Sequence, residues 1–328
     1  MKAITQDRYG SPDVLVLKEI NKPVAKDDEV LIRMRAAAVD AGTWHVMRGA
    51  PYIARLALGL RKPKSQLVGR DVAGTVEAVG QKVTRFRPGD EVWAEGDAGS
   101  FAEYLCVREK LVGLKPSNLT FEQAAAVPLS GNTALQGIRD QGQVKPGQRI
   151  LINGASGGVG TFAVQIAKSL GAEVTGVCST GKVDLVRSIG ADHVVDYTKE
   201  DFTKSAQRYD VIFDLAGDHS TAECRRVLTP NGILVLSSGN GGRWLGPIGR
   251  MMGALALSSF TRQRLRPLVV ARSKENLDAL KELVESGKVT PVIDRAFPLS
   301  EAAEAIRYLE QGNARGKVVI TVEPDRQA

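Results

Sequence analysis

Cysteine, histidine and aromatic residues are all scarce in this chain. Its 328 residues include three cysteines and three histidines, and Phe, Trp and Tyr together make up 5%. The cysteines Cys106, Cys178 and Cys224 are widely separated, with no CxxC pair. This pattern excludes a zinc ion held by four cysteines and gives no sign of a disulfide framework, so we expect reduced, buried thiols.

A long hydrophobic run is also missing. No segment reaches the roughly 18 consecutive apolar residues of a membrane span, and Met1 to Asp7 show no apolar signal region. The 43% hydrophobic and 25% charged content is that of an ordinary globular protein, and 328 residues suit two domains. We therefore expect a cytoplasmic protein with no membrane partner.

Acidic residues are outnumbered, since 44 Lys and Arg face 37 Asp and Glu. Much of the excess lies in two basic clusters, which form either a solvated surface or a rim that attracts an anionic ligand or an acidic surface. We expect no nucleic-acid partner, because the basic residues are not interleaved with aromatic ones. The clusters are Arg55, Arg61, Lys62 and Lys64, and then Arg243, Arg250, Arg262, Arg264 and Arg266.

Glycine, in contrast, is abundant, and one glycine-rich run is the most informative feature of the chain. The apolar run 149–152 before it predicts a buried strand, and apolar residues at helical spacing over 159–170 predict a helix after it. A strand, a glycine turn and a helix in this order present backbone N–H groups that can hold a pyrophosphate. We predict that a dinucleotide binds at Ala155, Ser156, Gly157, Gly158, Val159 and Gly160.

The rest of the chain divides into a β-rich part and a part in which strands and helices alternate. Residues 1–118 contain alternating segments at 29–35 and 73–79, and an alanine-rich helical pattern follows over 120–137. From residue 149 the alternation predicts a doubly wound parallel sheet. Its expected strands are 149–152, 173–178, 193–195, 211–215 and 232–236, and the tail adds helices near 276–285 and 300–311 and a strand at 317–322.

Residues 240–268 interrupt this alternation. The segment begins after Gly239 and carries Trp244, Met251 and Met252 in a helical pattern that is longer than a connection needs. It is either an extra packing helix or a part of the substrate-pocket wall or of a dimer contact.

Five motifs in order resemble the medium-chain dehydrogenase/reductase superfamily, in particular its zinc-free quinone oxidoreductase-like branch. The resemblance implies an α/β protein with a GroES-like β-rich domain (1–118 and 270–328) and an inserted Rossmann domain with a doubly wound parallel sheet (119–269). It also implies a homodimer formed through the Rossmann domain. The motifs are 69–76, 88–92, 131–134, 154–160 and 316–320.

The zinc alcohol dehydrogenases of this superfamily hold a catalytic metal with two cysteines and a histidine. The matching positions here are Asp40, Arg70 and Leu129. An arginine is always protonated and a leucine has no lone pair, so the sequence predicts no metal site.

The expected cofactor is NADPH rather than NADH. A carboxylate at the end of the second strand normally binds the free 2′-hydroxyl of NADH, but Ser179 and Lys182 stand there and can donate to a 2′-phosphate. The resemblance implies that Tyr197 also contacts the phosphate. It further implies that Thr133 and the segment Asn313, Ala314 and Arg315 lie near the cofactor.

Without a metal to polarise a simple carbonyl, the expected acceptor is a quinone or an α,β-unsaturated carbonyl compound that takes hydride readily. Thr43, His45 and Tyr52 are the catalytic candidates, and Trp44 is expected in the pocket wall or the core. The proton then comes from solvent or a weakly placed donor. Two alternatives remain open: an NADPH-binding sensor or interaction protein with little turnover, and an alcohol dehydrogenase.

Overall fold

The computed structural model describes residues 1–238 and 242–322, and it divides into two compact units. The first unit comprises Met1–Ser130, Arg272–Glu285 and the chain from Pro291 onward. The second unit comprises Gly131–Ala271 and Ser286–Thr290. Both chain ends therefore contribute to the first unit, and the second unit is inserted between them.

A mostly antiparallel sheet forms the framework of the first unit. Its strand order is β14-β15-β3-β4-β5-β7, β6 pairs with β3, and only β14 and β15 run parallel to each other. A separate hairpin joins β1 to β2. The strands are β1 (Lys2–Gln6), β2 (Leu15–Glu19), β3 (Glu29–Val39), β4 (Asp71–Val79), β5 (Glu91–Glu95), β6 (Tyr104–Arg108), β7 (Val112–Leu114), β14 (Ile293–Pro298) and β15 (Lys317–Thr321).

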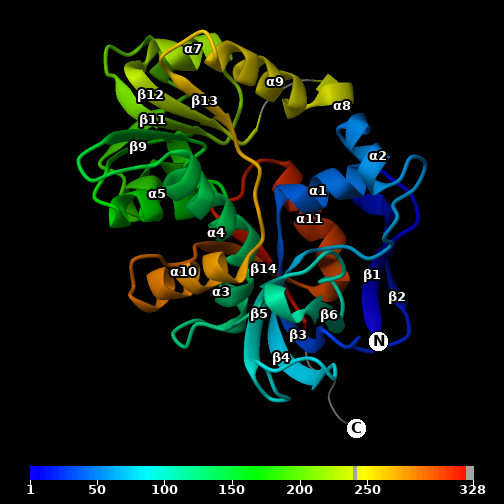
Figure 1. The fold of residues 1–328 in the computed structure, drawn as a ribbon. Helices are drawn as coiled ribbons and strands as arrows, with labels where there is room; N and C mark the ends of the chain where they lie inside the picture. Colours follow the sequence, from blue (N-terminus) through cyan, green and yellow to red (C-terminus); the bar gives the residue numbers. More distant parts are fainter. Residues whose placement is uncertain (239–241, 323–328) are drawn as a thin grey trace. The chain divides into compact units, whose positions relative to one another are not determined.

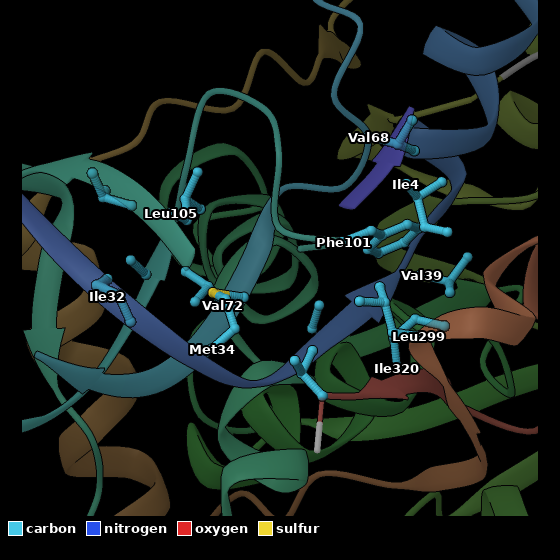
Figure 2. Packing of buried hydrophobic residues seen from close by; sticks show 14 of the residues in the cluster. Ile4, Ile32, Met34, Val39, Val68, Val72, Phe101, Leu105, Leu299 and Ile320 are labelled. Atoms are coloured by element: carbon cyan, nitrogen blue, oxygen red, sulfur yellow. The ribbon is translucent and has the colours of Figure 1, made fainter. Parts of the chain in front are cut away.

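The core of the first unit joins strands from both ends of the chain. Figure 2 shows Ile4 of β1 beside Val68 and Phe101, while Val39 of β3 and Ile320 of β15 lie farther along the same cluster. These side chains are at most 6% exposed. Their packing fixes β1 against the segments that precede β4 and β6, and this arrangement positions the end of β1.

Five α-helices accompany this sheet. Asp40 begins α1, because its carboxylate accepts a hydrogen bond from the Thr43 N–H (2.7 Å), and Gly49 ends it in the left-handed conformation. Thr120 and Gln123 form a capping box that begins α3. The helices are α1 (Ala41–Arg48), α2 (Arg55–Leu58), α3 (Phe121–Ala125), α10 (Lys274–Glu285) and α11 (Ala302–Glu310).

The second unit contains a six-stranded parallel sheet, drawn from green to yellow in Figure 1. Its order, β10-β9-β8-β11-β12-β13, is that of a Rossmann fold, with β8 as the first strand. The predicted α/β class and doubly wound sheet are confirmed. The strands are β8 (Arg149–Asn153), β9 (Glu173–Cys178), β10 (His193–Asp196), β11 (Tyr209–Asp214), β12 (Leu228–Leu236) and β13 (Arg264–Pro267), and the helices are α5 (Gly160–Ser169), α6 (Val183–Ser188) and α7 (Thr221–Arg226).

Residues 242–268 continue the alternation of helices and strands, which corrects the prediction of an interruption. After α8 (Gly242–Leu245), helix α9 (Pro247–Ser258) leads into β13, which pairs in parallel with β12. The strand reads Arg-Leu-Arg-Pro, with one buried apolar side chain, so its sequence gave no strand signal. Residues 239–241 and the side chain of Arg243 lie outside the described part.

The boundaries of the two units differ from the expected domain boundaries. Residues 119–130 lie in the first unit, because α3 packs on its sheet and the Leu129 N–H donates to Asp71 (2.9 Å). Ser286–Thr290 lies in the second unit, where Thr290 exchanges hydrogen bonds with Gln165. Helix α4 (Pro128–Leu135) crosses the boundary between the units and continues as a π-helix over Gln136–Gln141.

Within 1–238 and 242–322, no helix combines the length and the apolar character needed to span a bilayer.

Candidate nucleotide site and acceptor pocket

The glycine-rich turn between β8 and α5 is built so that its backbone can approach a ligand closely. Gly154 has a φ of +90°, a conformation that suits glycine. A Cβ on Gly160 would lie 2.1 Å from the Gly154 carbonyl oxygen, so no larger residue fits there. The Gly157 N–H donates to that same carbonyl (3.1 Å) and closes the turn.

This turn fits a pyrophosphate. Helix α5 begins at Gly160, so the N-terminal N–H groups and the positive end of its dipole lie at the carboxyl end of β8. There the strand order reverses between β8 and β11, the position at which doubly wound sheets bind nucleotides. Of the six predicted residues, Ala155, Ser156 and Gly160 are buried, and Gly157, Gly158 and Val159 are half-buried.

The predicted 2′-phosphate residues lie at the ends of two adjacent strands. Ser179 and Lys182 follow β9 and Tyr197 follows β10, and the Tyr197 N–H donates to the Cys178 carbonyl (3.1 Å). The Tyr197 side chain is 57% exposed. The second unit therefore brings Ser179, Lys182 and Tyr197 to one edge of the sheet, next to the glycine turn after β8.

A carboxylate that the sequence analysis missed binds these two strand ends together. Asp196, the last residue of β10, accepts hydrogen bonds from the Thr180 hydroxyl (2.6 Å) and the Thr198 hydroxyl (2.7 Å). These hydrogen bonds, together with the Lys199 ammonium 3.3 Å from the Asp196 carboxylate, lower the pKa of Asp196 to about 2. The only advance sign was an Asp-x-Thr pattern after a predicted strand, which is typical of an Asx turn.

A second buried network supports the carboxyl ends of β8 and β11. Asp214 accepts hydrogen bonds from Asn153 (2.9 Å), from the Gly217 N–H (2.9 Å) and from Arg250 of α9 (2.6 Å). The side chains of Arg250 and Asp214 are 10% and 0% exposed. Arg250 is therefore an internal partner of Asp214, which corrects its assignment to a basic surface cluster.

The remaining predicted cofactor contacts belong to different units. Thr133 lies in α4 within the second unit and is 8% exposed. Asn313, Ala314 and Arg315 precede β15 in the first unit, where the Arg315 N–H donates to Asp294 (3.1 Å). Neither unit alone brings this segment to the glycine turn.

The three positions matched to zinc ligands have other partners in the first unit. Asp40 accepts hydrogen bonds from the N–H and the hydroxyl of Thr43 (2.7 and 3.0 Å). Arg70 donates to Glu95 (2.6 Å). Leu129 offers only its backbone, so these positions do not fit a tetrahedral zinc site. Within the described residues, no three His, Cys, Asp or Glu side chains are placed to hold a metal ion.

The catalytic candidates all lie around α1. Thr43 is 3% exposed and bonded to Asp40, while the ring of Tyr52 lies under the Arg55 guanidinium, 4.5 Å away. Burial lowers the pKa of His45, and its Nδ1 lies 3.0 Å from the Ala50 carbonyl, so the neutral ring with Nδ1 as donor is favoured. His45 is therefore poorly suited to carry the extra proton of an imidazolium near neutral pH.

Other side chains of this region pack within the first unit. Trp44 packs against the core and donates from Nε1 to Glu310, which also binds Arg48. In the first basic cluster, Arg55 stacks on Tyr9 (4.6 Å) and donates to the Gly49 carbonyl (2.9 Å). Trp44 thus packs against the core, which is one of its two expected locations, and Arg55 is a structural residue.

Comparison with known proteins agrees with this architecture. Residues 26–117 match the family described as alcohol dehydrogenase GroES-like domain, and residues 189–320 match the family described as zinc-binding dehydrogenase. The chain is 38% identical to the 2-methylene-furan-3-one reductase of Solanum lycopersicum, over 98% of this chain and 79% of that protein. This chain belongs to the medium-chain dehydrogenase/reductase superfamily.

Two further members of this superfamily narrow the resemblance to one branch. The NADPH-dependent alkenal/one oxidoreductase, chloroplastic, of Arabidopsis thaliana is 37% identical over 98% of this chain and 79% of that protein. The quinone oxidoreductase structure from Coxiella burnetii superposes with a TM-score of 0.87 at 31% identity, covering 98% of this chain and 99% of that chain. The predicted family and the predicted two-part fold are confirmed.

Proposed function

We propose that this protein is an oxidoreductase that transfers hydride from NADPH to a quinone or an α,β-unsaturated carbonyl compound without zinc. The observation that carries this function is Arg70, which stands at the position of a metal-binding histidine and pairs with Glu95. A permanent cation there cannot ligate zinc, so the acceptor has to be one that accepts hydride without a metal. The names of the relatives from tomato, Arabidopsis and Coxiella support this acceptor class.

The residues of the second unit support a nicotinamide cofactor, and NADPH in particular. The turn from Ala155 to Gly160 would hold the pyrophosphate through its backbone N–H groups. Ser179, Lys182 and Tyr197 would hold the 2′-phosphate, for which charge-assisted hydrogen bonds are suited. Bound there, the cofactor supplies the hydride. The predicted contacts at Thr133, Asn313, Ala314 and Arg315 remain part of this proposal.

The first unit would bind the acceptor. Thr43 and His45 do not stand out as proton donors, because Thr43 is bonded to Asp40 and His45 favours its neutral form. Tyr52 stacks under Arg55 and is the side-chain candidate that remains. We propose solvent as the source of the proton that completes the reduction, and unchanged turnover in Tyr52→Phe would support it.

The decisive experiment is NADPH oxidation by the purified protein. We expect turnover with 9,10-phenanthrenequinone and with an alkenal, and no oxidation of a simple secondary alcohol in the presence of NADP⁺. Tight NADPH binding without turnover of any acceptor would instead favour the sensor or interaction protein, and efficient alcohol oxidation would favour an alcohol dehydrogenase.

A cytoplasmic location and a homodimer formed through the second unit also belong to this proposal. The Arabidopsis relative is named as chloroplastic, so location varies among relatives. Cell fractionation and analytical ultracentrifugation test the two expectations separately.

A further inference from the structure

A small cavity in the first unit lies beside Arg70. It is lined by Gln6 at the end of β1, by Thr43 and Val46 of α1, and by Gly69 and Arg70 just before β4, and its volume is about 30 Å³. A water molecule needs roughly 10–15 Å³ of such space. The cavity therefore accepts two or three atoms the size of oxygen, and it is too small for an aromatic ring.

Gln6 is the most unusual residue of this cavity. It is 2% exposed and lies two residues after Ile4, so the two side chains are on the same face of β1. Figure 2 shows Ile4 on that face beside Val68 and Phe101. Its backbone N–H donates to the Gln66 carbonyl (2.8 Å), but neither polar atom of its side-chain amide has a partner among residues 1–238 and 242–322. A buried amide without a hydrogen-bond partner destabilises the folded state. Such a group needs an explanation, and a ligand that accepts or donates a hydrogen bond would supply one.

Arg70 presents a second donor to the same cavity. One terminal nitrogen of its guanidinium donates to Glu95, whereas its Nε is buried without a hydrogen-bond partner in the described part of the chain. The carboxylate at the cavity, Asp97, has its oxygens paired with Arg272 (2.7 Å) and Arg108 (3.4 Å). The donors that remain for a ligand are thus an amide and a guanidinium, a pair suited to an oxygen that gains negative charge.

We propose that this cavity binds the carbonyl oxygen of the acceptor, with Gln6 Nε2 and the Arg70 guanidinium donating to it. The proposal rests on the proposed function. When hydride adds to the β-carbon of an enone, the electron pair of the C=C bond shifts towards the carbonyl group. An enolate with its negative charge on oxygen results, and a proton from solvent then adds to the α-carbon. Hydrogen bonds from a neutral amide and a cation strengthen as this charge develops.

The test replaces Gln6 with leucine and uses Gln66→Leu as the matched control, because Gln66 is an exposed glutamine on the segment that pairs with β1. We expect Gln6→Leu to lower kcat/KM for an enone on the order of 100-fold while the Kd for NADPH stays unchanged. Removal of the unpartnered amide should also raise Tm by roughly 2 °C. Gln66→Leu should change none of these three quantities.

A binding measurement separates this inference from the proposed function. Cyclohexanone and methylenecyclohexane have similar shapes, but only the ketone carries an oxygen. Saturation-transfer NMR should show that Gln6→Leu weakens binding of the ketone and leaves binding of the hydrocarbon unchanged. Absence of turnover in the natural protein would overturn the proposed function, whereas equal ketone binding, or equal turnover, in Gln6→Leu and the natural protein would overturn the role of the cavity.

Discussion

At the scale of single residues, Gly157 and Gly160 look alike in the sequence, but glycine is needed at the two positions for different reasons. Gly160 is needed for packing, because a Cβ would collide with the Gly154 carbonyl at 2.1 Å. A Cβ on Gly157 would meet only that carbonyl, at an ordinary contact distance of 3.4 Å. Gly157 therefore has room within the protein itself, and its lack of a side chain matters only for the approach of a ligand.

We predict different effects for alanine at these two positions. Gly160→Ala should lower the free energy of unfolding by about 1–3 kcal/mol through overpacking. Gly157→Ala should change it by less than about 0.5 kcal/mol but raise the Kd for NADPH at least tenfold. Denaturant titration and fluorescence titration with NADPH check these outcomes. Gly253→Ala in α9 is the control, since nothing lies within 4 Å of its Cβ, and equal NADPH binding by Gly157→Ala would contradict the site.

At the scale of elements, the ends of β9 and β10 carry the residues that we propose for recognition of the 2′-phosphate. The strands pair in parallel, with Asp196 opposite Cys178, and the Asp196 carboxylate holds the Thr180 hydroxyl that lies between Ser179 and Lys182. Two segments 18 residues apart in sequence are also linked by the hydroxyls of Thr180 and Thr198 (2.8 Å). The segment that carries the proposed phosphate ligands is thus positioned by hydrogen bonds within the protein itself.

We predict that the double variant Ser179→Ala, Lys182→Ala loses its preference for NADPH. Each charge-assisted hydrogen bond is worth roughly 1.5–3 kcal/mol, so kcat/KM for NADPH should fall on the order of 100-fold or more. The value for NADH should change little, because NADH carries no 2′-phosphate. Initial rates with both cofactors provide the measurement. Ser188→Ala is a control, because Ser188 is the last residue of α6, the helix that begins directly after Lys182. An unchanged ratio of the two values would refute the phosphate assignment.

At the scale of the whole molecule, the chain carries a two-part dehydrogenase fold in which the metal positions hold other groups. Asp40 caps α1, Arg70 pairs with Glu95, and Leu129 binds Asp71 through its backbone. All three groups form hydrogen bonds within the first unit, so each of these positions has a structural role that involves no metal ion.

We predict that metal removal leaves the activity intact. Prolonged dialysis against a chelator such as EDTA should change the rate of NADPH oxidation with a quinone or enone by less than about twofold, because no step needs a Lewis acid. Elemental analysis of the active protein should give less than about 0.1 zinc per chain, far below the stoichiometry of a bound catalytic ion. A chelator-sensitive rate that zinc restores would show that the metal-free mechanism is wrong.

The sequence by itself determined the local chemistry of this protein. The run from Asn153 to Gly160 specified a strand, a turn and a helix because glycine conformation and helical periodicity are properties of neighbouring residues. The replacement of metal ligands by Arg70 and Leu129 was equally plain, since it depends on side-chain identity. Ser179 and Lys182 could be proposed as phosphate ligands from the sequence because they follow a predicted strand, and this assignment stays a prediction.

Only the tertiary structure decided which distant residues meet. The strand β13 forms because β12 offers it a free edge, although its own sequence contains two arginines and a proline. Asp196 reaches Thr180 through the pairing of β10 with β9, and Gln6 is buried by core packing at the end of β1. Such contacts join residues far apart in the chain, and neither propensity nor periodicity, which act over a few residues, carries information about them.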